Sequence, residues 1–429
     1  MSMNYQETLD WLFGLEARGI KFGLKNITEL MHRMGDPQES YRTIHVGGTN
    51  GKGSVCALTA SALMEARYSV GMYTSPHIVD FGERIQIDGV LLPEKDMLRL
   101  AEEIREISES MAEESPEKRM TFFELTTAMA FTRFAEMQVD WAVIEVGMGG
   151  RLDATNIMIP ECTVITRLAI EHTEFLGNGI DQIAYEKAGI LKRGVPLVTG
   201  ASPGNGLETI VKIAQELDAP IKVLDEDLKY RLLQTSLEGT DMEIVGGPRL
   251  SSMLAGGYQA ANMALAYMAL KELHLPELND EAIARGMRNA KWPGRLETIH
   301  TSPRVILDAS HTGDGARVVA AELSKLLEGD MILVMGVLGD KDLDEMARAF
   351  GSLSKRAIAT SPRSKRSFSA NSVEEALLPH CPLVERMDDV GNALHHALEI
   401  SDPKDTILVT GSLYTIGEAK RWWDANKGC

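Results

Sequence analysis

A glycine-rich turn between a predicted strand and a predicted helix is the feature that most constrains the fold of this chain. Residues 47–54 read Gly-Gly-Thr-Asn-Gly-Lys-Gly-Ser and follow an alternating apolar run at Ile44 and Val46. Glycines allow the backbone N–H groups to converge, and a helix start adds about half a positive charge. The turn therefore predicts a phosphate-binding loop. Apolar residues at the spacing of one helix face follow it: Val55, Leu58, Ala62 and Leu63.

The spacing of this loop departs from the common motif. That motif has a Gly five positions before its Gly-Lys pair and a Ser or Thr directly after the Lys. Here Val46 occupies the first position, and Gly53 separates Lys52 from Ser54. The alternative is a turn that binds nothing, but four glycines with a Lys and a Ser favour ATP-type phosphate binding. Lys52 would neutralise phosphate oxygens, and the Ser54 hydroxyl would bind Mg²⁺.

Length and charge limit the class of protein. A chain of 429 residues exceeds one ordinary core and predicts two domains. A net charge of −18 disfavours nucleic-acid and membrane surfaces as partners, and no apolar run has the length of a membrane span. The four cysteines show no paired spacing, so neither a zinc site nor a disulfide framework is predicted. We expect a cytoplasmic protein.

Two polar positions follow predicted strands near the loop. Residues 141–145 form an apolar run that ends in Glu145, and His172 follows the short strand predicted at 164–166. Parallel sheets bind ligands at the carboxyl ends of their strands, and a carboxylate there can hold Mg²⁺. The alternatives are a surface acid at Glu145 and a hydrogen-bonded structural histidine at His172.

A Pro-Gly pair at Pro293 and Gly294 marks the predicted domain boundary. We expect an α/β fold with a P-loop ATPase-type domain at 1–295, which has a mostly parallel sheet. A smaller Rossmann-like α/β domain is expected at 296–429. The second domain lacks a glycine fingerprint for a dinucleotide, and its predicted strands are 305–308, 331–335, 357–360 and 406–410.

These motifs resemble those of the folylpolyglutamate synthase and dihydrofolate synthase family, a branch of the Mur-type ATP-dependent amide ligases. Residues 45–54 resemble the nucleotide loop of that family. Residues 147–156 resemble its loop after the buried strand, and residues 19–24 resemble its N-terminal segment. The chain departs from the family pattern at four places: Asp88 for Asn, Glu171 for Asp, Tyr258 for His, and Thr312-Gly313 for Asn-Pro.

The resemblance implies an ATP-dependent ligase that adds L-glutamate to a folate or dihydropteroate carboxylate. An acyl phosphate would form, and ADP and phosphate would be released. It implies ATP as a substrate, two Mg²⁺ ions and a carbamate on Lys187. The expected partners are these small molecules, with the protein acting as a monomer. The alternatives are a nucleotide-hydrolysing regulatory switch and a related ligase for another pterin acceptor.

The resemblance also assigns roles to individual residues. Catalysis is assigned to Lys52, Lys187 and His172. ATP binding is assigned to Thr49, Asn50, Gly51, Lys52, Gly53, Ser54, Asn262, Arg295 and Asp308. Metal binding is assigned to Ser54, Glu145, His172 and Lys187. Substrate binding is assigned to Ser75, His77, Arg84, Phe122, Phe123, Glu124, Asp153, His311 and Ser412.

Several of these residues also have a purely structural interpretation. Thr121 and Glu124 have the spacing of a helix capping box. The two phenylalanines at 122 and 123 could pack in the core, and Lys187 could pair with an acid. Asn262 could be a helix-surface amide, and Arg295 could pack between domains. His311 and Ser412 could cap helices.

Overall fold

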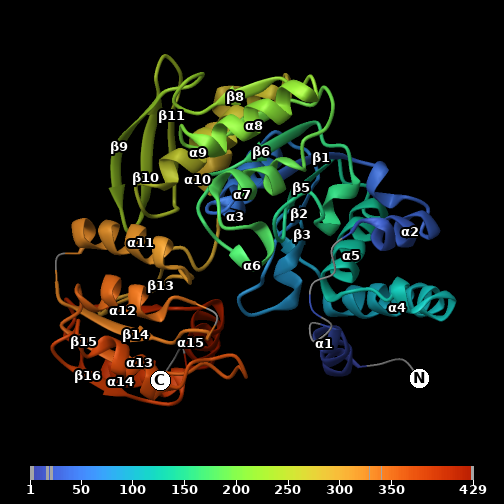
Figure 1. Ribbon diagram of the computed structural model, residues 1–429. Coiled ribbons are helices and arrows are strands. Elements are labelled where there is room, and N and C mark those ends of the chain that lie inside the picture. The colour runs from blue at the N-terminus through green and yellow to red at the C-terminus, as the bar shows by residue number, and fades with distance from the viewer. Residues whose placement is uncertain (1–3, 16–18, 20–22, 328, 340, 427–429) are drawn as a thin grey trace.

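Figure 1 shows the computed structural model, which describes residues 4–15, 19, 23–327, 329–339 and 341–426. Residues 20–22 of the segment 19–24, singled out for its family resemblance, lie outside the described residues. The described strands form three sheets. Two sheets are built from residues before 253, and the third is built from residues after 296, the orange and red part of Figure 1. The expected α/β class is confirmed.

The largest sheet contains the phosphate loop at the end of a central strand. Six of its eight described strands run parallel, while β3 and β4 form an antiparallel edge. In sheet order the strands are β4 (Val90–Leu91), β3 (Ile85–Ile87), β2 (Val70–Tyr73), β5 (Trp141–Glu145), β1 (Arg42–Gly47), β6 (Cys162–Ile165), β7 (Leu197–Thr199) and β8 (Ile221–Val223).

Helices cover both faces of this sheet because its central strands are apolar on both sides. In β5, Trp141 and Val143 join the core cluster on one face, and Ile144 joins the cluster on the other. On the first face lie α3 (Lys52–Glu65), α9 (Gln259–Glu272) and α10 (Asp280–Asn289). On the second face lie α1 (Tyr5–Gly14), α2 (Lys25–Arg33), α4 (Glu94–Glu114), α5 (Phe122–Glu136), α7 (Ile180–Ala188) and α8 (Asn205–Glu216).

Burial of α3 differs from the sequence expectation. The spacing predicted one apolar face, but every residue from Gly53 to Leu63 is buried. The sheet covers one side of α3, and α9 and α10 cover the other. The small residues of this helix allow that close packing.

A second, smaller sheet is an antiparallel meander beside α9. Its strands are β9 (Tyr230–Ser236), β10 (Gly239–Ile244) and β11 (Arg249–Ser252). After α10 the chain enters the third sheet through the linker at 290–296. The backbone N–H of Gly257 donates to Glu322 Oε2 at 2.8 Å, which links the segment before α9 to helix α11 (Gly313–Leu326).

The third sheet has six described strands, of which only β12 is antiparallel. In sheet order they are β12 (Glu297–Thr301), β13 (Arg304–Leu307), β17 (Thr406–Thr410), β14 (Met331–Met335), β15 (Arg356–Ala359) and β16 (Val384–Arg386). One face carries α11 (Gly313–Leu326), α12 (Leu343–Gly351) and α13 (Ala370–Leu377); the other carries α14 (Val390–Ile400) and α15 (Leu413–Asn426). The four predicted strands are confirmed, and the edge strands β12 and β16 were not predicted. Among the described residues, no helix is both long and apolar enough to cross a membrane.

Candidate active site

The phosphate loop joins β1 to the buried start of α3. Gly51 precedes the first helical residue and has a φ of +95°, which favours glycine. A Cβ atom at this position would lie 2.4 Å from Oδ1 of Asn262, so the amide of Asn262 lies directly against the loop. The Nδ2 group of Asn262 donates to Gln259 Oε1 at 2.8 Å, which fixes its orientation. Asn262 therefore lies beside the phosphate loop, and its contact with a nucleotide stays a prediction.

Lys52 and Thr49 stabilise the shape of the loop. Lys52 Nζ donates to the Thr49 carbonyl oxygen at 3.1 Å. The Thr49 hydroxyl exchanges hydrogen bonds with the backbone of Ala169, receiving from its N–H at 3.1 Å and donating to its oxygen at 3.2 Å. Ser54 is buried in the first turn of α3. The loop is thus tied to the segment after β6.

Glu145 ends β5 as a buried carboxylate beside the loop. Its Oε2 accepts a hydrogen bond of 3.2 Å from the backbone N–H of Ser75. Burial raises the pKa of Glu145, and the charges of Lys52 and Arg295 act in the opposite direction. Three predicted site residues on different segments are therefore within electrostatic reach of one another. A buried carboxylate with a raised pKa is stabilised further by a bound cation.

Lys187 lies under the loop with almost no exposed surface. Its Nζ donates to the Gly48 carbonyl oxygen at 2.8 Å and to Glu171 Oε1 at 2.7 Å. Burial lowers the pKa of Lys187 to about 8, although Glu171 raises it. The pKa of Glu171 is lowered, because Lys187 and Lys52 outweigh the effect of its burial. The neighbouring Glu186 instead pairs with Arg151 at 2.9 Å.

The predicted metal ligands come from four segments around the loop. His172 is exposed, follows Glu171, and precedes the short helix α6 (Thr173–Leu176). Within the described residues, no three His, Cys, Asp or Glu side chains form a ready metal cluster. The predicted set contains only two such side chains, Glu145 and His172. A hydroxyl from Ser54 and a carbamate on Lys187 would supply the oxygen ligands that hard divalent cations prefer.

Several residues assigned to substrate binding form an aromatic group between α1, α5 and the 75–84 loop. The Arg84 guanidinium lies 5.0 Å from the Phe122 ring, and Phe122 stacks on Phe13 with 5.6 Å between centroids. Arg84 Nε donates to His77 Nδ1 at 2.8 Å. Burial lowers the pKa of His77 to about 3, so this ring is neutral and carries its proton on Nε2. An N–H donor beside flat apolar rings suits a pterin.

Phe123, Glu124 and Asp153 have structural contacts of their own. Phe123 lies 6.0 Å from the Tyr73 ring. The capping box is confirmed: Glu124 Oε2 accepts from the Thr121 N–H at 2.8 Å, and the Thr121 hydroxyl accepts from the Glu124 N–H at 3.3 Å. Asp153 accepts two hydrogen bonds from Thr155, at 3.1 Å from the N–H and 2.6 Å from the hydroxyl. Their substrate contacts stay predictions.

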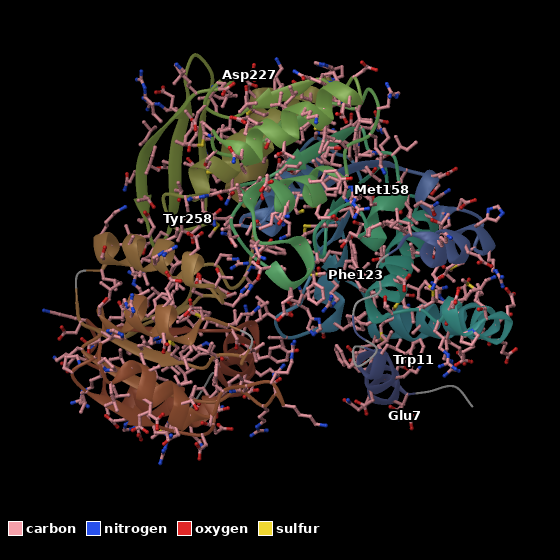
Figure 2. The ribbon with its side chains drawn as sticks, in the orientation of Figure 1. Glu7, Trp11, Phe123, Met158, Asp227 and Tyr258 are labelled. Carbon is pink, nitrogen blue, oxygen red and sulfur yellow. The ribbon has the colours of Figure 1, made fainter. Side chains whose placement is uncertain are left out.

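The departures from the family pattern also have structural roles. Asp88 has a φ of +51° in the β3–β4 turn, and its Oδ1 accepts the Val70 N–H at 2.7 Å. Figure 2 shows Tyr258 where the N-terminal part meets α11, and its ring packs against the core of the C-terminal sheet. The Thr312 hydroxyl caps α11 by accepting the Gly315 N–H at 3.1 Å.

Two predicted nucleotide ligands meet where the C-terminal sheet begins. Asp308 is fully buried, and its carboxylate accepts the N–H groups of Leu296 at 3.1 Å and Ser310 at 2.9 Å. Arg295 precedes Leu296, and its charge lowers the pKa of Glu145 and of His311. The linker arginine therefore lies within reach of both parts of the molecule.

His311 and Ser412, the predicted glutamate ligands, differ in their remaining hydrogen-bonding capacity. His311 Nδ1 lies 2.9 Å from the Ala309 carbonyl oxygen, and burial lowers the pKa of His311 to about 4. The ring is therefore neutral, donates from Nδ1, and keeps Nε2 as an acceptor. Ser412 is buried, and its hydroxyl accepts the Thr415 N–H at 3.1 Å and lies 2.8 Å from the Thr415 hydroxyl. These contacts favour a capping role for Ser412.

Glu171, Asp314 and Trp292 lie outside the predicted site set but contact it closely. Glu171 pairs with Lys187. Asp314, on α11, accepts a hydrogen bond of 3.4 Å from the Asn50 side chain in the phosphate loop. Trp292 lies against Gly53. Glu171 had a sequence signal because it directly precedes His172, and Trp292 begins the Trp-Pro-Gly-Arg run at the predicted domain boundary.

Comparison with protein families identifies two matching regions. Residues 46–270 match the Mur ligase middle domain, and residues 294–413 match the Mur ligase glutamate ligase domain. A Bacillus subtilis dihydrofolate synthase/folylpolyglutamate synthase is 32% identical, and the match covers 97% of this chain and 98% of the relative. A Haloferax volcanii protein, a probable bifunctional folylpolyglutamate synthase/dihydropteroate synthase, is 35% identical over 98% of this chain. The chain spans 51% of that relative's length.

Solved structures give the same result. Escherichia coli FolC in complex with DHPP and ADP is similar with a TM-score of 0.89 and 30% identity, covering 99% of this chain and 100% of that one. A bifunctional folylpolyglutamate synthase/dihydrofolate synthase with Mn, AMPPNP and L-glutamate bound has a TM-score of 0.84 and 29% identity. That match covers 99% of each chain.

Proposed function

We infer the reaction of this chain from its family: the chain belongs to the Mur ligase family, and within it to the folylpolyglutamate synthase/dihydrofolate synthase group. It is an ATP-dependent ligase that joins L-glutamate to the carboxylate of a folate or dihydropteroate. ADP and phosphate are the other products.

One observation carries this proposal for the chain's own residues. The buried carboxylate of Glu145 is within electrostatic reach of Lys52 from the phosphate loop and of Arg295 from the interdomain linker. Phosphoryl transfer is accelerated mainly by fixed charges around the transferred group. Two cations and a carboxylate able to hold a metal are the groups such a transfer requires.

The reaction proceeds in two balanced steps. An oxygen of the acceptor carboxylate attacks the γ-phosphorus of ATP, the bond to the β-phosphate oxygen breaks, and ADP leaves with that electron pair. The glutamate amine then attacks the acyl carbon, loses a proton, and expels inorganic phosphate from a tetrahedral intermediate. Lys52 and Arg295 offset the charge that moves between phosphate oxygens. Packing of the C-terminal domain against the loop would exclude water, which hydrolyses acyl phosphates.

The proposed reaction also uses divalent metal ions. We propose Mg²⁺ as the ion in use, held by Ser54, Glu145, His172 and a carbamate on Lys187. When bound, Mg²⁺ polarises the phosphate oxygens and neutralises their charge. The structure of a relative with Mn, AMPPNP and L-glutamate bound supports the use of a divalent cation with the nucleotide. The raised pKa of Glu145 supports a metal ion there independently, because a neighbouring cation would offset the cost of burying that charge.

We assign the acceptor and glutamate to different domains. We propose that the pterin binds among Phe122, His77 and Arg84, because flat rings and fixed donors meet there. Glutamate is assigned to the carboxyl ends of the third sheet. There, Nε2 of His311 accepts an N–H of the glutamate amine rather than donating to a carboxylate.

We also propose a domain boundary, a cellular compartment and an oligomeric state for the protein. We place the ATP and pterin domain at 1–295 and the glutamate-binding domain at 296–429. The linker ahead of β12 and the separate third sheet support this boundary. We propose a cytoplasmic monomer that acts on small molecules, since the net charge of −18 disfavours binding to nucleic acid and membrane surfaces.

The test is ADP release with ATP, glutamate and one of three additions: dihydropteroate, tetrahydrofolate or no acceptor. We expect ADP release to require an acceptor and to be matched by amide product. The preferred acceptor separates the dihydrofolate synthase reaction from the folylpolyglutamate synthase reaction. Release of ADP at the same rate without an acceptor would support a nucleotide switch and overturn the proposal.

A further inference from the structure

The indole ring of Trp292 lies directly on the phosphate loop. A Cβ atom at Gly53 would lie 2.3 Å from Cζ2 and 2.7 Å from Cε2 of Trp292, closer than real atoms approach. Gly53 is the residue that separates Lys52 from Ser54 and makes this loop depart from the common spacing. The ring of Trp292 leaves no room for a side chain at position 53, which explains why the extra residue is a glycine.

Trp292 is also attached to the interdomain linker. Its ring packs against the core cluster shared by α3, α9 and α10. Two residues later, Gly294 lies against Ile78 and Ile416, each 2.8 Å from a Cβ placed at that position. Arg295 follows and acts electrostatically on Glu145. Within four residues, the linker contacts the phosphate loop, the 75–84 loop and α15.

We propose that Trp292 is a positioning residue for nucleotide binding: its indole holds the turn at Gly53 and so fixes Lys52 and Ser54 relative to the linker. The side chain touches neither phosphate nor metal in this role. Because the same ring is anchored next to Gly294, a shift of the C-terminal domain about the linker is transmitted to the phosphate loop. The proposal rests on nucleotide use by that loop.

A double-mutant cycle tests the pair, with ADP affinity measured by calorimetry. Gly53→Ala should weaken ADP binding about tenfold, because a methyl group forced against a packed ring displaces the ring or the loop. Trp292→Leu removes the obstructing atoms and keeps apolar bulk. The double variant Gly53→Ala/Trp292→Leu should therefore bind ADP several-fold more tightly than Gly53→Ala alone, a non-additive result.

The chain offers a matched control pair remote from the loop. Trp422 of α15 covers Gly391 of α14 in the same way, with 2.5 Å between its Cδ1 and a Cβ placed at Gly391. Gly391→Ala and Trp422→Leu should lower the melting temperature without changing ADP affinity. A conservative variant, Trp292→Phe, keeps an aromatic ring and guards against poor folding of the leucine variant.

Tryptophan fluorescence distinguishes a positioning role of Trp292 from a purely structural one, because only a positioning role makes its emission respond to ADP. ADP should change the tryptophan emission of the wild-type protein, and Trp292→Phe should lose most of that change. The KM for the pterin acceptor should stay within about twofold in Trp292→Phe while the KM for ATP rises. Wild-type ADP affinity in Gly53→Ala, or a double variant no better than Gly53→Ala, would overturn the proposal. Failure of the wild-type protein to bind ADP would instead overturn the proposed function.

Discussion

The side chains of Lys187 and Glu171 form a buried ion pair, with 2.7 Å between Nζ and Oε1 and only 2% and 14% of the two side chains exposed. The same Nζ holds the carbonyl oxygen of Gly48 at 2.8 Å, so the pair supports the phosphate loop from beneath. A buried lysine whose pKa is about 8 keeps roughly a tenth of its amine neutral at pH 7, far more than at its ordinary value. A neutral amine is the form that reacts with carbon dioxide.

We therefore predict that Lys187 carries a carbamate when bicarbonate and a divalent cation are supplied. Carbon-13 bicarbonate should give a carbamate signal in the NMR spectrum of the wild-type protein. Lys187→Gln should abolish that signal. Lys192→Gln is the control, because Lys192 donates to Asn156 and is not among the proposed metal ligands. A spectrum without a signal that depends on Lys187 would contradict the assignment.

Lys52→Ala and Glu145→Ala should each lower the rate of amide formation by about 10²–10³-fold. Each removes a fixed electrostatic contact from the transferring phosphate or its metal ion. Initial rates at saturating substrates measure the effect, and melting curves check that the fold is retained. Glu109→Ala alters an exposed carboxylate on α4 and should leave the rate unchanged. Near-normal turnover in either site variant would show that the phosphate site is placed wrongly.

His311→Ala should raise the KM for glutamate at least about tenfold and change the KM values for ATP and pterin far less, because an acceptor for the glutamate amine is lost. Ser412→Ala provides the comparison. Its hydroxyl is committed to the first turn of α15, so loss of the cap should lower stability by about 1 kcal/mol and leave all three KM values unchanged. If His311→Ala alters only stability, His311 is also a structural residue and the glutamate site lies elsewhere.

The stability of the protein should fall as the pH falls below about 6.5. Burial lowers the pKa of His45 and of His77 to about 3 and that of His311 to about 4, so these rings stay neutral in the fold. In the unfolded chain they take up protons near pH 6.5, so unfolding binds protons between that pH and the folded values. Each such proton contributes a slope of about 1.4 kcal/mol per pH unit.

Urea unfolding between about pH 4.5 and 6 measures this slope. His311→Asn should reduce it by about 1.4 kcal/mol per pH unit. His274→Asn, at an exposed position with a φ of +52° that Asn tolerates, should leave it unchanged. An unchanged slope in His311→Asn would mean that His311 titrates normally in the fold.

Local sequence patterns were sufficient to predict the elements that carry the site. The alternation at Ile44 and Val46, the glycines that follow, and the capping box at Thr121 and Glu124 are each determined by neighbours within a few residues. The buried run ending in Glu145 is equally local. Each of these patterns depends on residues close together in the sequence, and the structure has the predicted strand, capping box and buried strand at these positions.

Contacts between distant segments could not be predicted in the same way. Nothing in residues 52–65 indicates that α9 and α10, about two hundred residues later, cover the outer side of α3. The partner of Lys187 is Glu171 rather than its neighbour Glu186, because Glu186 points toward Arg151. The fit of Trp292 on Gly53 joins residues more than two hundred positions apart.

Transfer of oxygen from the acceptor to phosphate tests the acyl-phosphate account most directly. Dihydropteroate labelled with oxygen-18 in its carboxylate is incubated with the enzyme, ATP, Mg²⁺ and L-glutamate, and the released phosphate is analysed by mass spectrometry. If the enzyme does not use dihydropteroate, tetrahydrofolate labelled with oxygen-18 in its reacting carboxylate takes its place. An acyl-phosphate intermediate predicts one oxygen-18 atom in each phosphate released, in step with amide formation. Unlabelled phosphate released alongside amide product would contradict it.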